Sequence, residues 1–186
     1  MILHPWHEVP LGRHAPSICW AFIEISRRSR AKYEIDKESG LLKLDRVLHS
    51  SVTYPTNYGF FPQTLHEDGD PLDVLVLSQV EITPYCLVEV KVIGVMSMID
   101  QGLPDDKIIA VAVTDPSVNF IDDISAIPEY LEKEIIHFFV TYKILENKQV
   151  TAERFQNKEV ALRIVRESIE NYKTKYSGKE KSIVEV

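Results

Sequence analysis

The sequence has few of the residues on which several common site types depend. Its two cysteines, Cys19 and Cys86, form no C-x-x-C pair, so nothing indicates a disulfide scaffold or a structural zinc site. The seven glycines are nowhere closer than eight residues apart, which excludes a P-loop and a dinucleotide-binding glycine motif. H-E-x-x-H and G-x-S-x-G are absent as well. Metal or phosphate chemistry therefore has to come from scattered side chains.

Long hydrophobic runs are also absent. No segment approaches the run of about 18 apolar residues that a membrane-spanning helix needs, and the N-terminal stretch MILHPWHEVPLGRHAPS lacks the pattern of a secretory signal. With 45% hydrophobic and 26% charged residues, the composition is typical of a soluble globular protein. We therefore expect a cytoplasmic protein with no membrane partner.

An excess of positive charge is missing too. The chain has 21 lysines and arginines against 28 acids, for a net charge of −7. Nucleic-acid binding needs a basic surface, so no nucleic-acid partner is expected. An anionic substrate can still bind if metal ions intervene.

The order of predicted elements favours an α+β fold. Strand-like segments cover residues 18–25, 31–36, 41–45, 74–77, 87–99 and 107–114, whereas helical periodicity begins at Pro128 and again after Asn157. Strands followed by helices predict a closed or strongly curved antiparallel sheet with helices outside it. The length of 186 residues favours a single domain over residues 1–186, with an N-terminal extension at 1–17 and a flexible tail at 177–186.

The stretch EDGDPLDVLVL, residues 67–77, places four acids directly before an apolar run. Carboxylates about 4 Å apart repel by roughly 4 kcal/mol at an effective dielectric constant of about 20, so a fold that gathers them needs protons or cations. If DGDP is extended, Asp68 and Asp70 point to one side and Asp73 enters the strand. Such carboxylates suit Mg²⁺, but a solvated turn is an equally good interpretation. An EF-hand is excluded because Asp73 stands where that loop requires glycine.

Other charged residues lie on predicted strands and turns. Glu24 falls on the first strand, and Lys32 and Glu34 share a face of the second. Taken alone, these residues are better explained as a solvent-facing strand with a surface ion pair. Asp100, Asp105 and Lys107 surround a predicted hairpin, where ordinary turn chemistry is the alternative.

Two tyrosines lie in TYPTNYGFFP, where prolines and a glycine exclude regular helix. We expect Tyr54 and Tyr58 on a rigid irregular segment, either as core residues or as donors to phosphate oxygens. Tyr142 lies on the buried stripe of the first helix, and Lys143 follows at its C-terminal end, where a cation suits the helix dipole.

Seven segments together resemble soluble family I inorganic pyrophosphatases, particularly the short bacterial type. They are IEI, KYEIDKESG, LDR, YPTNYGF, DGDPLDVLVL, DQGLPDDKIIAV and HFFVTYK, in this order over residues 20–145. The resemblance implies a five-stranded OB-like closed β-barrel flanked by two main α-helices. It also implies Mg²⁺-dependent hydrolysis of inorganic pyrophosphate to two orthophosphates by direct attack of a metal-activated water.

The resemblance also implies a set of site residues. The expected metal ligands, with two glutamates completing the acidic cavity, are Asp68, Asp70, Asp73, Asp100, Asp105, Glu24 and Glu34. The expected substrate-binding residues are Lys32, Glu34, Arg46, Tyr54, Tyr58, Lys107, Tyr142 and Lys143. The expected catalytic residues are Asp70, Lys32, Arg46 and Tyr58, with Asp70 accepting the proton of the attacking water.

Further expectations concern cofactor and assembly. Several Mg²⁺ ions are implied in each site, with Mn²⁺ or Zn²⁺ able to substitute, and the chain is expected to form a homohexamer. Gln101 stands where the family often has an acid, so we expect it to alter metal affinity at the edge of the cavity. The rival interpretations are an OB-type nucleic-acid binding module, a divalent-ion buffer, and a hydrolase of longer or organic polyphosphates.

Overall fold

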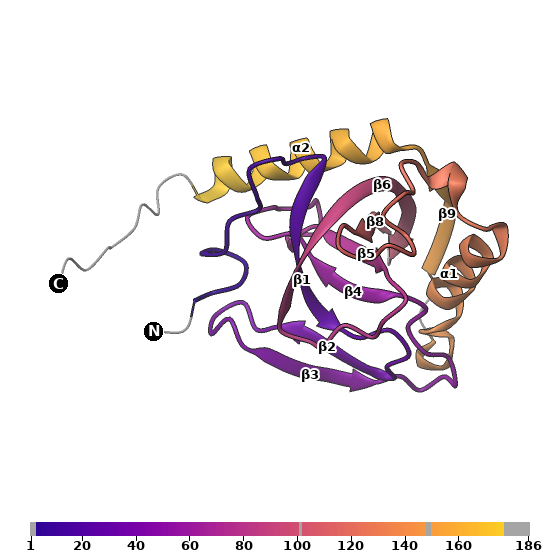
Figure 1. Cartoon of the computed structure of the whole chain (residues 1–186). Helices are drawn as coiled ribbons and strands as arrows, with labels where there is room; N and C mark the ends of the chain where they lie inside the picture. The colour runs from indigo at the N-terminus through magenta and orange to yellow at the C-terminus, as the bar shows by residue number, and fades with distance from the viewer. Residues whose placement is uncertain (1–2, 101, 148–149, 177–186) are drawn as a thin grey trace, which may run out of the picture.

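The computed structural model describes residues 3–100, 102–147 and 150–176, whose elements are drawn in Figure 1. Gln101 and the tail at 177–186, about which the sequence made predictions, lie outside the described residues. The strands are β1 (Ile18–Ile25), β2 (Ala31–Ile35), β3 (Leu42–Val47), β4 (Asn57–Phe60), β5 (Asp73–Leu77), β6 (Cys86–Asp100), β7 (Leu103–Pro104), β8 (Lys107–Ala112) and β9 (Val150–Gln156). The helices are α1 (Glu129–Thr141) and α2 (Lys158–Tyr176), with the short 3₁₀ helices η1 (Ile124–Ala126) and η2 (Ile144–Glu146).

Five strands close into a barrel. The order β1-β4-β5-β8-β6 is completed by a second pairing of β6 with β1. This confirms the expected five-stranded OB-like barrel with two flanking helices. The prediction of a wholly antiparallel sheet is wrong, because β5 and β8 are parallel. β5 and β8 run in the same direction because β6 lies between them in the sequence. The chain returns along β6, which is antiparallel to β8.

The long strand β6 takes part in four pairings because it bends. It is 15 residues long and pairs with β1, β7, β8 and β9. Its register against β8 shifts between Val92 and Gly94. A Cβ at Gly94 would lie 2.7 Å from Ile124 Cβ, closer than ordinary packing allows. The glycine lets η1 pack directly on the bend.

The central strands are buried on both faces, which explains their unbroken apolar sequence. Leu75 of β5 packs in one cluster with Ile135 and Phe138 of α1. Its neighbour Val74 packs in another cluster, with Val165 of α2. Alternate side chains of β5 thus meet different helices, and Figure 1 shows α1 and α2 on separate sides of the barrel.

The sequence missed three strands, β4, β7 and β9, and misjudged one segment. β4 lies within the stretch expected to be irregular, so Tyr58 is on a strand of only four residues between prolines. β9 pairs only with β6, at the edge of the sheet, where polar residues obscure the alternating pattern. The second helix was placed correctly, since Asn157 Oδ1 accepts a hydrogen bond from Val160 N at 3.2 Å.

The hairpin of β2 and β3 forms a separate two-stranded sheet. It lies beside the barrel (Figure 1). One tie to the barrel is Glu24 of β1, whose Oε1 accepts a hydrogen bond from Ile35 N at 2.7 Å. The hairpin therefore supplies a wall that is not part of the barrel sheet. Within the described ranges, no helix is both long and apolar enough to cross a bilayer.

Candidate functional site

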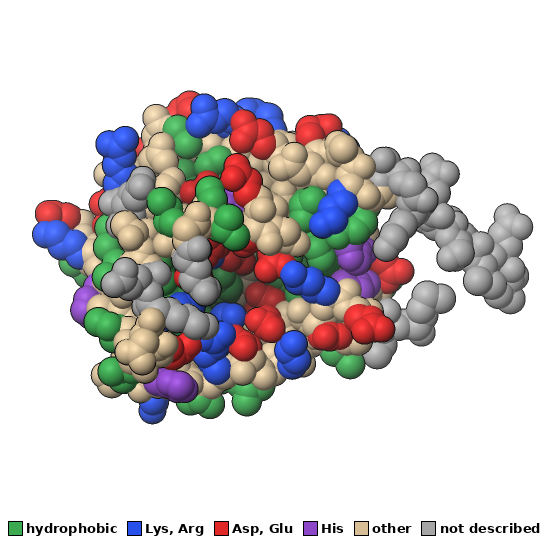
Figure 2. All heavy atoms as spheres, turned by 180° about the vertical axis from the view of Figure 1, so that it is seen from behind, with side chains coloured by type: hydrophobic (Ala, Val, Ile, Leu, Met, Phe, Trp, Pro, Cys, Tyr) green, Lys and Arg blue, Asp and Glu red, His purple; other side chains and the backbone are tan. Residues whose placement is uncertain are grey.

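A cavity of about 530 Å³ lies between the hairpin, the barrel and the end of α1. Figure 2 shows acidic and basic side chains gathered around a hollow. Among the described residues, nine carboxylates and five lysines line it. The lining residues are Glu24, Lys32, Tyr33, Glu34, Ile35, Asp36, Lys37, Glu38, Lys43, Tyr58, Phe60, Asp68, Asp70, Pro71, Asp73, Asp100, Asp105, Lys107, Tyr142 and Lys143.

Nearly all of the residues expected from the sequence meet in this cavity. All seven acids line it, together with Lys32, Lys107, Lys143 and the tyrosines at 58 and 142. Tyr54 does not, since it is 2% exposed and packs against the rings of Tyr58 and Phe138. Arg46 lies beside the cavity rather than in its wall. The structure therefore places Tyr54 in the core.

The parallel pairing of β5 and β8 builds the floor of the site. Asp73 and Lys107 are register partners at the starts of these strands. The Lys107 ammonium forms ion pairs with both Asp73 and Asp105, and its side chain is only 3% exposed. Burial alone would lower the pKa of Lys107, but the two carboxylates more than offset it, so the pKa is raised. Lys107 is therefore a permanent cation at the floor.

A tyrosine completes the floor. The Tyr58 hydroxyl donates to Asp73 Oδ2 at 2.5 Å. Burial, and then the negative charge of Asp73, raises the pKa of Tyr58 well above its usual range. Burial followed by Asp100 does the same for Tyr142. Both hydroxyls stay protonated at neutral pH and are available as hydrogen-bond donors.

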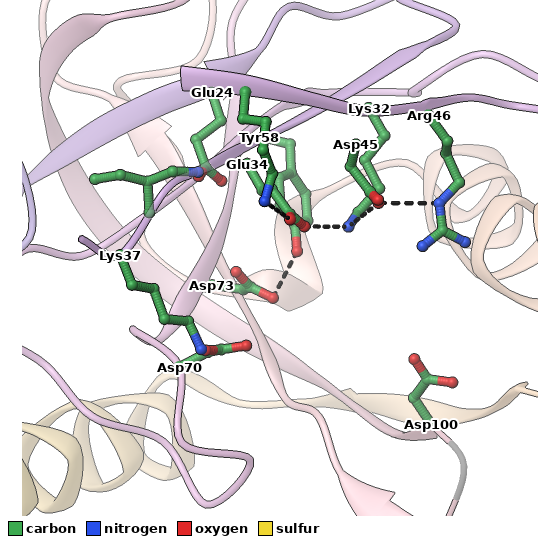
Figure 3. A network of polar contacts seen from close by, with 12 residues as sticks. Glu24, Lys32, Glu34, Lys37, Asp45, Arg46, Tyr58, Asp70, Asp73 and Asp100 are labelled. Carbon is green, nitrogen blue, oxygen red and sulfur yellow. Dashed lines mark hydrogen bonds and ion pairs between the residues drawn. The ribbon is translucent and has the colours of Figure 1, made fainter. Parts of the chain in front are cut away.

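The hairpin contributes a chain of ion pairs (Figure 3). Lys32 Nζ contacts Asp45 Oδ2 at 2.9 Å and Glu34 Oε2 at 3.2 Å. Arg46, the register partner of Lys32, donates from Nε to the same Asp45 oxygen at 2.9 Å. Its guanidinium also pairs with Glu146. Two carboxylates therefore fix the orientation of Arg46.

Lys143 forms the other deep ion pair. It follows α1 and pairs with Asp100 at the end of β6, 43 residues away in the sequence. Its side chain is 10% exposed and that of Asp100 is 16% exposed. The C-terminal end of the helix thus brings a cation deep into the cavity.

The segment DGDP is a tight turn, which corrects the extended conformation considered from the sequence. Asp68 Oδ1 accepts a hydrogen bond from Asp70 N at 2.9 Å. Gly69 has a φ of 87°, a left-handed conformation that glycine adopts without strain. Burial, with a smaller effect from Asp73, raises the pKa of Asp68. The turn holds Asp68 and Asp70 at the mouth of the cavity rather than side by side.

Glu24 differs from the other acids because it is almost fully enclosed. It is 5% exposed. Burial, and then the charge of Asp73, raises its pKa to about 8. In this arrangement Glu24 is largely protonated at neutral pH. It acts as a hydrogen-bonded tie to the hairpin as well as a cavity residue.

Sequence reasoning missed Lys37, Asp45 and Glu146. Lys37 pairs with Asp70 across the cavity, while Asp45 and Glu146 hold Arg46. Lys37 and Asp45 fall inside the segments KYEIDKESG and LDR that carried the family resemblance, so a signal for them existed. Nothing local marks Glu146, which lies 100 residues from its partner.

The donor set fits a hard divalent cation in its chemistry. The five aspartates offer only oxygen, which Mg²⁺ prefers. Asp100 lines the cavity, and its Oδ1 is buried and accepts no hydrogen bond from a described residue, so one strong acceptor is left unused. No group of three His, Cys, Asp or Glu side chains within the described part of the chain is close enough to form a ready-made metal site. Five of the acids are instead paired with lysines: Glu34, Asp70, Asp73, Asp100 and Asp105.

Comparison with known proteins identifies the family. A family model described as inorganic pyrophosphatase matches residues 21–173. The soluble inorganic pyrophosphatase of Oryza sativa subsp. indica is 50% identical over 169 residues, covering 91% of this chain and 79% of the rice protein. Soluble inorganic pyrophosphatase 2 of Chlamydomonas reinhardtii is 49% identical, covering 93% of this chain and 90% of the algal one.

A solved structure of a similar protein supports the same family assignment. The crystal structure of inorganic pyrophosphatase from Thermus thermophilus matches with a TM-score of 0.89 and 42% identity, over 92% of this chain and 99% of the bacterial chain. The sequence, the barrel and the cavity thus lead to the same conclusion. The chain belongs to the family of soluble inorganic pyrophosphatases, family I.

Proposed function

We propose that this chain is a Mg²⁺-dependent enzyme that hydrolyses inorganic pyrophosphate to two orthophosphates. The main support is a single cavity lined by both lysines and carboxylates. A polyanion bound together with divalent cations needs both kinds of group. A nucleic-acid module would need a basic groove with exposed aromatic residues, and an ion buffer would have no use for the lysines.

The cations bind the substrate in this proposal. Lys107 and Lys143 are the deepest, with side chains 3% and 10% exposed. Lys32 adds a third cation on the hairpin wall, and Arg46 contacts phosphate from beside it. Charge-assisted hydrogen bonds from such groups stabilise the departing phosphate, and losing one donor costs roughly 2 to 4 kcal/mol of barrier.

Mg²⁺ is the proposed cofactor. Asp68, Asp70, Asp73, Asp100 and Asp105 would hold it, with Glu24 and Glu34 completing the acidic cavity. When bound, the metal supplies charge neutralisation and Lewis-acid activation of water. The buried, unused oxygen of Asp100 supports this assignment.

Asp70 is the proposed general base. Its side chain is 47% exposed, and although Oδ1 is buried beside Lys37, Oδ2 is left to accept a proton at the mouth of the cavity. Asp70 accepts a proton from the attacking water as the new phosphorus–oxygen bond forms and the bond to the bridging oxygen breaks. The protonated hydroxyl of Tyr142 donates a hydrogen bond to a phosphate oxygen, and that of Tyr58 does so when it exchanges Asp73 Oδ2 for the substrate.

The proposal is tested by colorimetric phosphate release from pyrophosphate, with and without Mg²⁺, and with ATP as a competing substrate. We expect release that requires Mg²⁺ and is much faster from pyrophosphate than from ATP. Absence of release with ample Mg²⁺ would reject the function. Tight metal binding without release would favour an ion buffer.

We further propose a cytoplasmic homohexamer. Phe120 is 71% exposed, and Tyr130 on α1 is 70% exposed. Large exposed aromatic side chains are favoured at protein interfaces, which supports contacts between subunits at these residues. The cytoplasmic location rests on the composition, which is typical of a soluble globular protein.

A further inference from the structure

The lysines of the cavity lie at different depths. The side chains of Lys107 and Lys143 are 3% and 10% exposed, whereas those of Lys37 and Lys43 are each 56% exposed. The first two lysines form the floor of the cavity and the last two lie at its rim. A bound anion that fills the floor meets the rim lysines only if it is long.

Of the two rim lysines, Lys37 reaches across the mouth. It lies in the turn between β2 and β3 and forms an ion pair with Asp70, in the turn before β5. Figure 3 shows its side chain extending from the hairpin to Asp70. Lys43 instead pairs with Glu34 of its own hairpin, at 3.4 Å. The Lys37–Asp70 pair therefore joins two walls that no backbone ladder between described strands connects.

The N-terminal segment 4–8 holds the hairpin turn in this position. The His4 ring nitrogen Nε2 lies 3.2 Å from the Lys37 carbonyl oxygen. The same ring packs closely on Gly40, where an added Cβ would be 3.1 Å from His4 Cδ2. Trp6 anchors the segment, since it is 2% exposed and its indole donates to Thr64 O at 2.8 Å. The turn is thus fixed from outside the barrel.

We propose that Lys37 is a specificity-determining residue that restricts the site to diphosphate and disfavours longer polyphosphates. This inference rests on the proposed function. Pyrophosphate is held by the floor lysines while Lys37 stays paired with Asp70 Oδ1, which leaves Asp70 Oδ2 to act on the attacking water. A third phosphate group extends to the mouth and requires the Lys37–Asp70 pair to open. His4 acts as a positioning residue by holding the turn that carries Lys37.

The test compares kcat/KM for tripolyphosphate with kcat/KM for pyrophosphate in the full-length enzyme. Exposed ion pairs contribute little free energy, so Lys37→Ala should raise the ratio by about two- to fivefold. Lys37→Arg, which keeps the cation, should retain the wild-type ratio. Lys43→Ala is the matched control, because it removes an equally exposed lysine from the same hairpin. It should leave the ratio unchanged.

His4→Ala tests the positioning role. It should raise the ratio in the same direction as Lys37→Ala and add nothing when combined with that substitution. A general loss of stability would lower activity on both substrates in both backgrounds, which would reject the role of His4.

Three outcomes would overturn the inference. If the wild type splits pyrophosphate but Lys37→Ala keeps or lowers the ratio, Lys37 does not exclude longer chains, although the proposed function stands. If Lys43→Ala raises the ratio equally, the change comes from losing any positive charge at the rim and not from opening the Lys37–Asp70 pair. If the wild type releases no phosphate from pyrophosphate, the proposed function itself is wrong and the inference falls with it.

Discussion

The acids of the cavity are paired rather than left to repel one another. Asp73 and Asp105 share Lys107, Asp100 pairs with Lys143, and Asp70 pairs with Lys37. Buried charges are tolerated only with such compensation. The pairing answers at the level of single residues why acids can gather before a core strand. The pairing also means that a bound anion has to replace an aspartate as the partner of a lysine.

The first residue-scale prediction concerns Asp70→Asn. This change keeps the shape of the side chain but removes its capacity to accept a proton, so we expect turnover to fall by about 100-fold or more. Thermal unfolding should be nearly unchanged, because Asp70 is half-exposed. Asp122→Asn is the control, since Asp122 is an acid outside the cavity whose side chain is 78% exposed. Near-normal turnover of Asp70→Asn would refute its role.

The second residue-scale prediction concerns Glu24, whose pKa is about 8 in the folded chain against 4.5 for an unperturbed glutamate. Between these values the folded chain retains a proton that the unfolded chain releases. The contribution of Glu24 to stability is therefore complete below pH 4.5 and is lost as the pH rises through 8.

Glu24→Gln removes this titration and keeps an oxygen that can accept from Ile35 N. The free energy of unfolding of the variant, relative to wild type, should rise between about pH 5 and about pH 8. Urea unfolding without added metal measures this difference. An equal difference at both pH values would show that Glu24 titrates normally.

At the scale of elements, the site depends on close contact between strands. Gly59 of β4 faces the backbone of β1, where an added Cβ would overlap Phe22 O and come within 2.9 Å of Ile23 Cα. Backbone atoms cannot move aside without separating the two strands. Because Gly59 has no side chain, β1 and β4 can approach closely enough to close the barrel at this point.

Gly59→Ala should accordingly reduce the free energy of unfolding by about 2 kcal/mol or more, or prevent folding. Gly69→Ala is the comparison, because no atom lies within 4 Å of a Cβ built there. It should cost only about 1 kcal/mol, from its left-handed backbone. Chemical denaturation of both variants measures the difference. Equal losses of unfolding free energy in the two variants would mean that the close contact between β1 and β4 does not limit stability.

At the scale of the whole molecule, the proposed assembly is testable. Sedimentation velocity at neutral pH should give the mass of six chains of 21.3 kDa each. Tyr130→Glu should weaken assembly because it places a charge where we expect an apolar contact, whereas Tyr130→Phe should preserve it. A monomeric wild type would reject the homohexamer, and a hexameric Tyr130→Glu would exclude this part of α1 from the interface.

Much of the architecture was predictable because local patterns dominate it. The apolar run after Asp73 and the stripe of α1 follow from periodicity alone. β4 and β9 were not predictable, because β4 is only four residues long and β9 is an edge strand. Their pairing is decided by neighbouring strands rather than by their own sequence.

The candidate site, like the fold, was only partly predictable from the sequence. The sequence by itself determined the family, and it predicted the site residues, since aspartates, lysines and tyrosines in recognisable segments carry the resemblance. Only the tertiary structure decided which acid faces which cation. Lys37 and Asp70, or Arg46 and Glu146, meet because separate walls are brought together. The physical reason is that ion pairing depends on distance in space, which strand pairing and the N-terminal segment set over long stretches of chain.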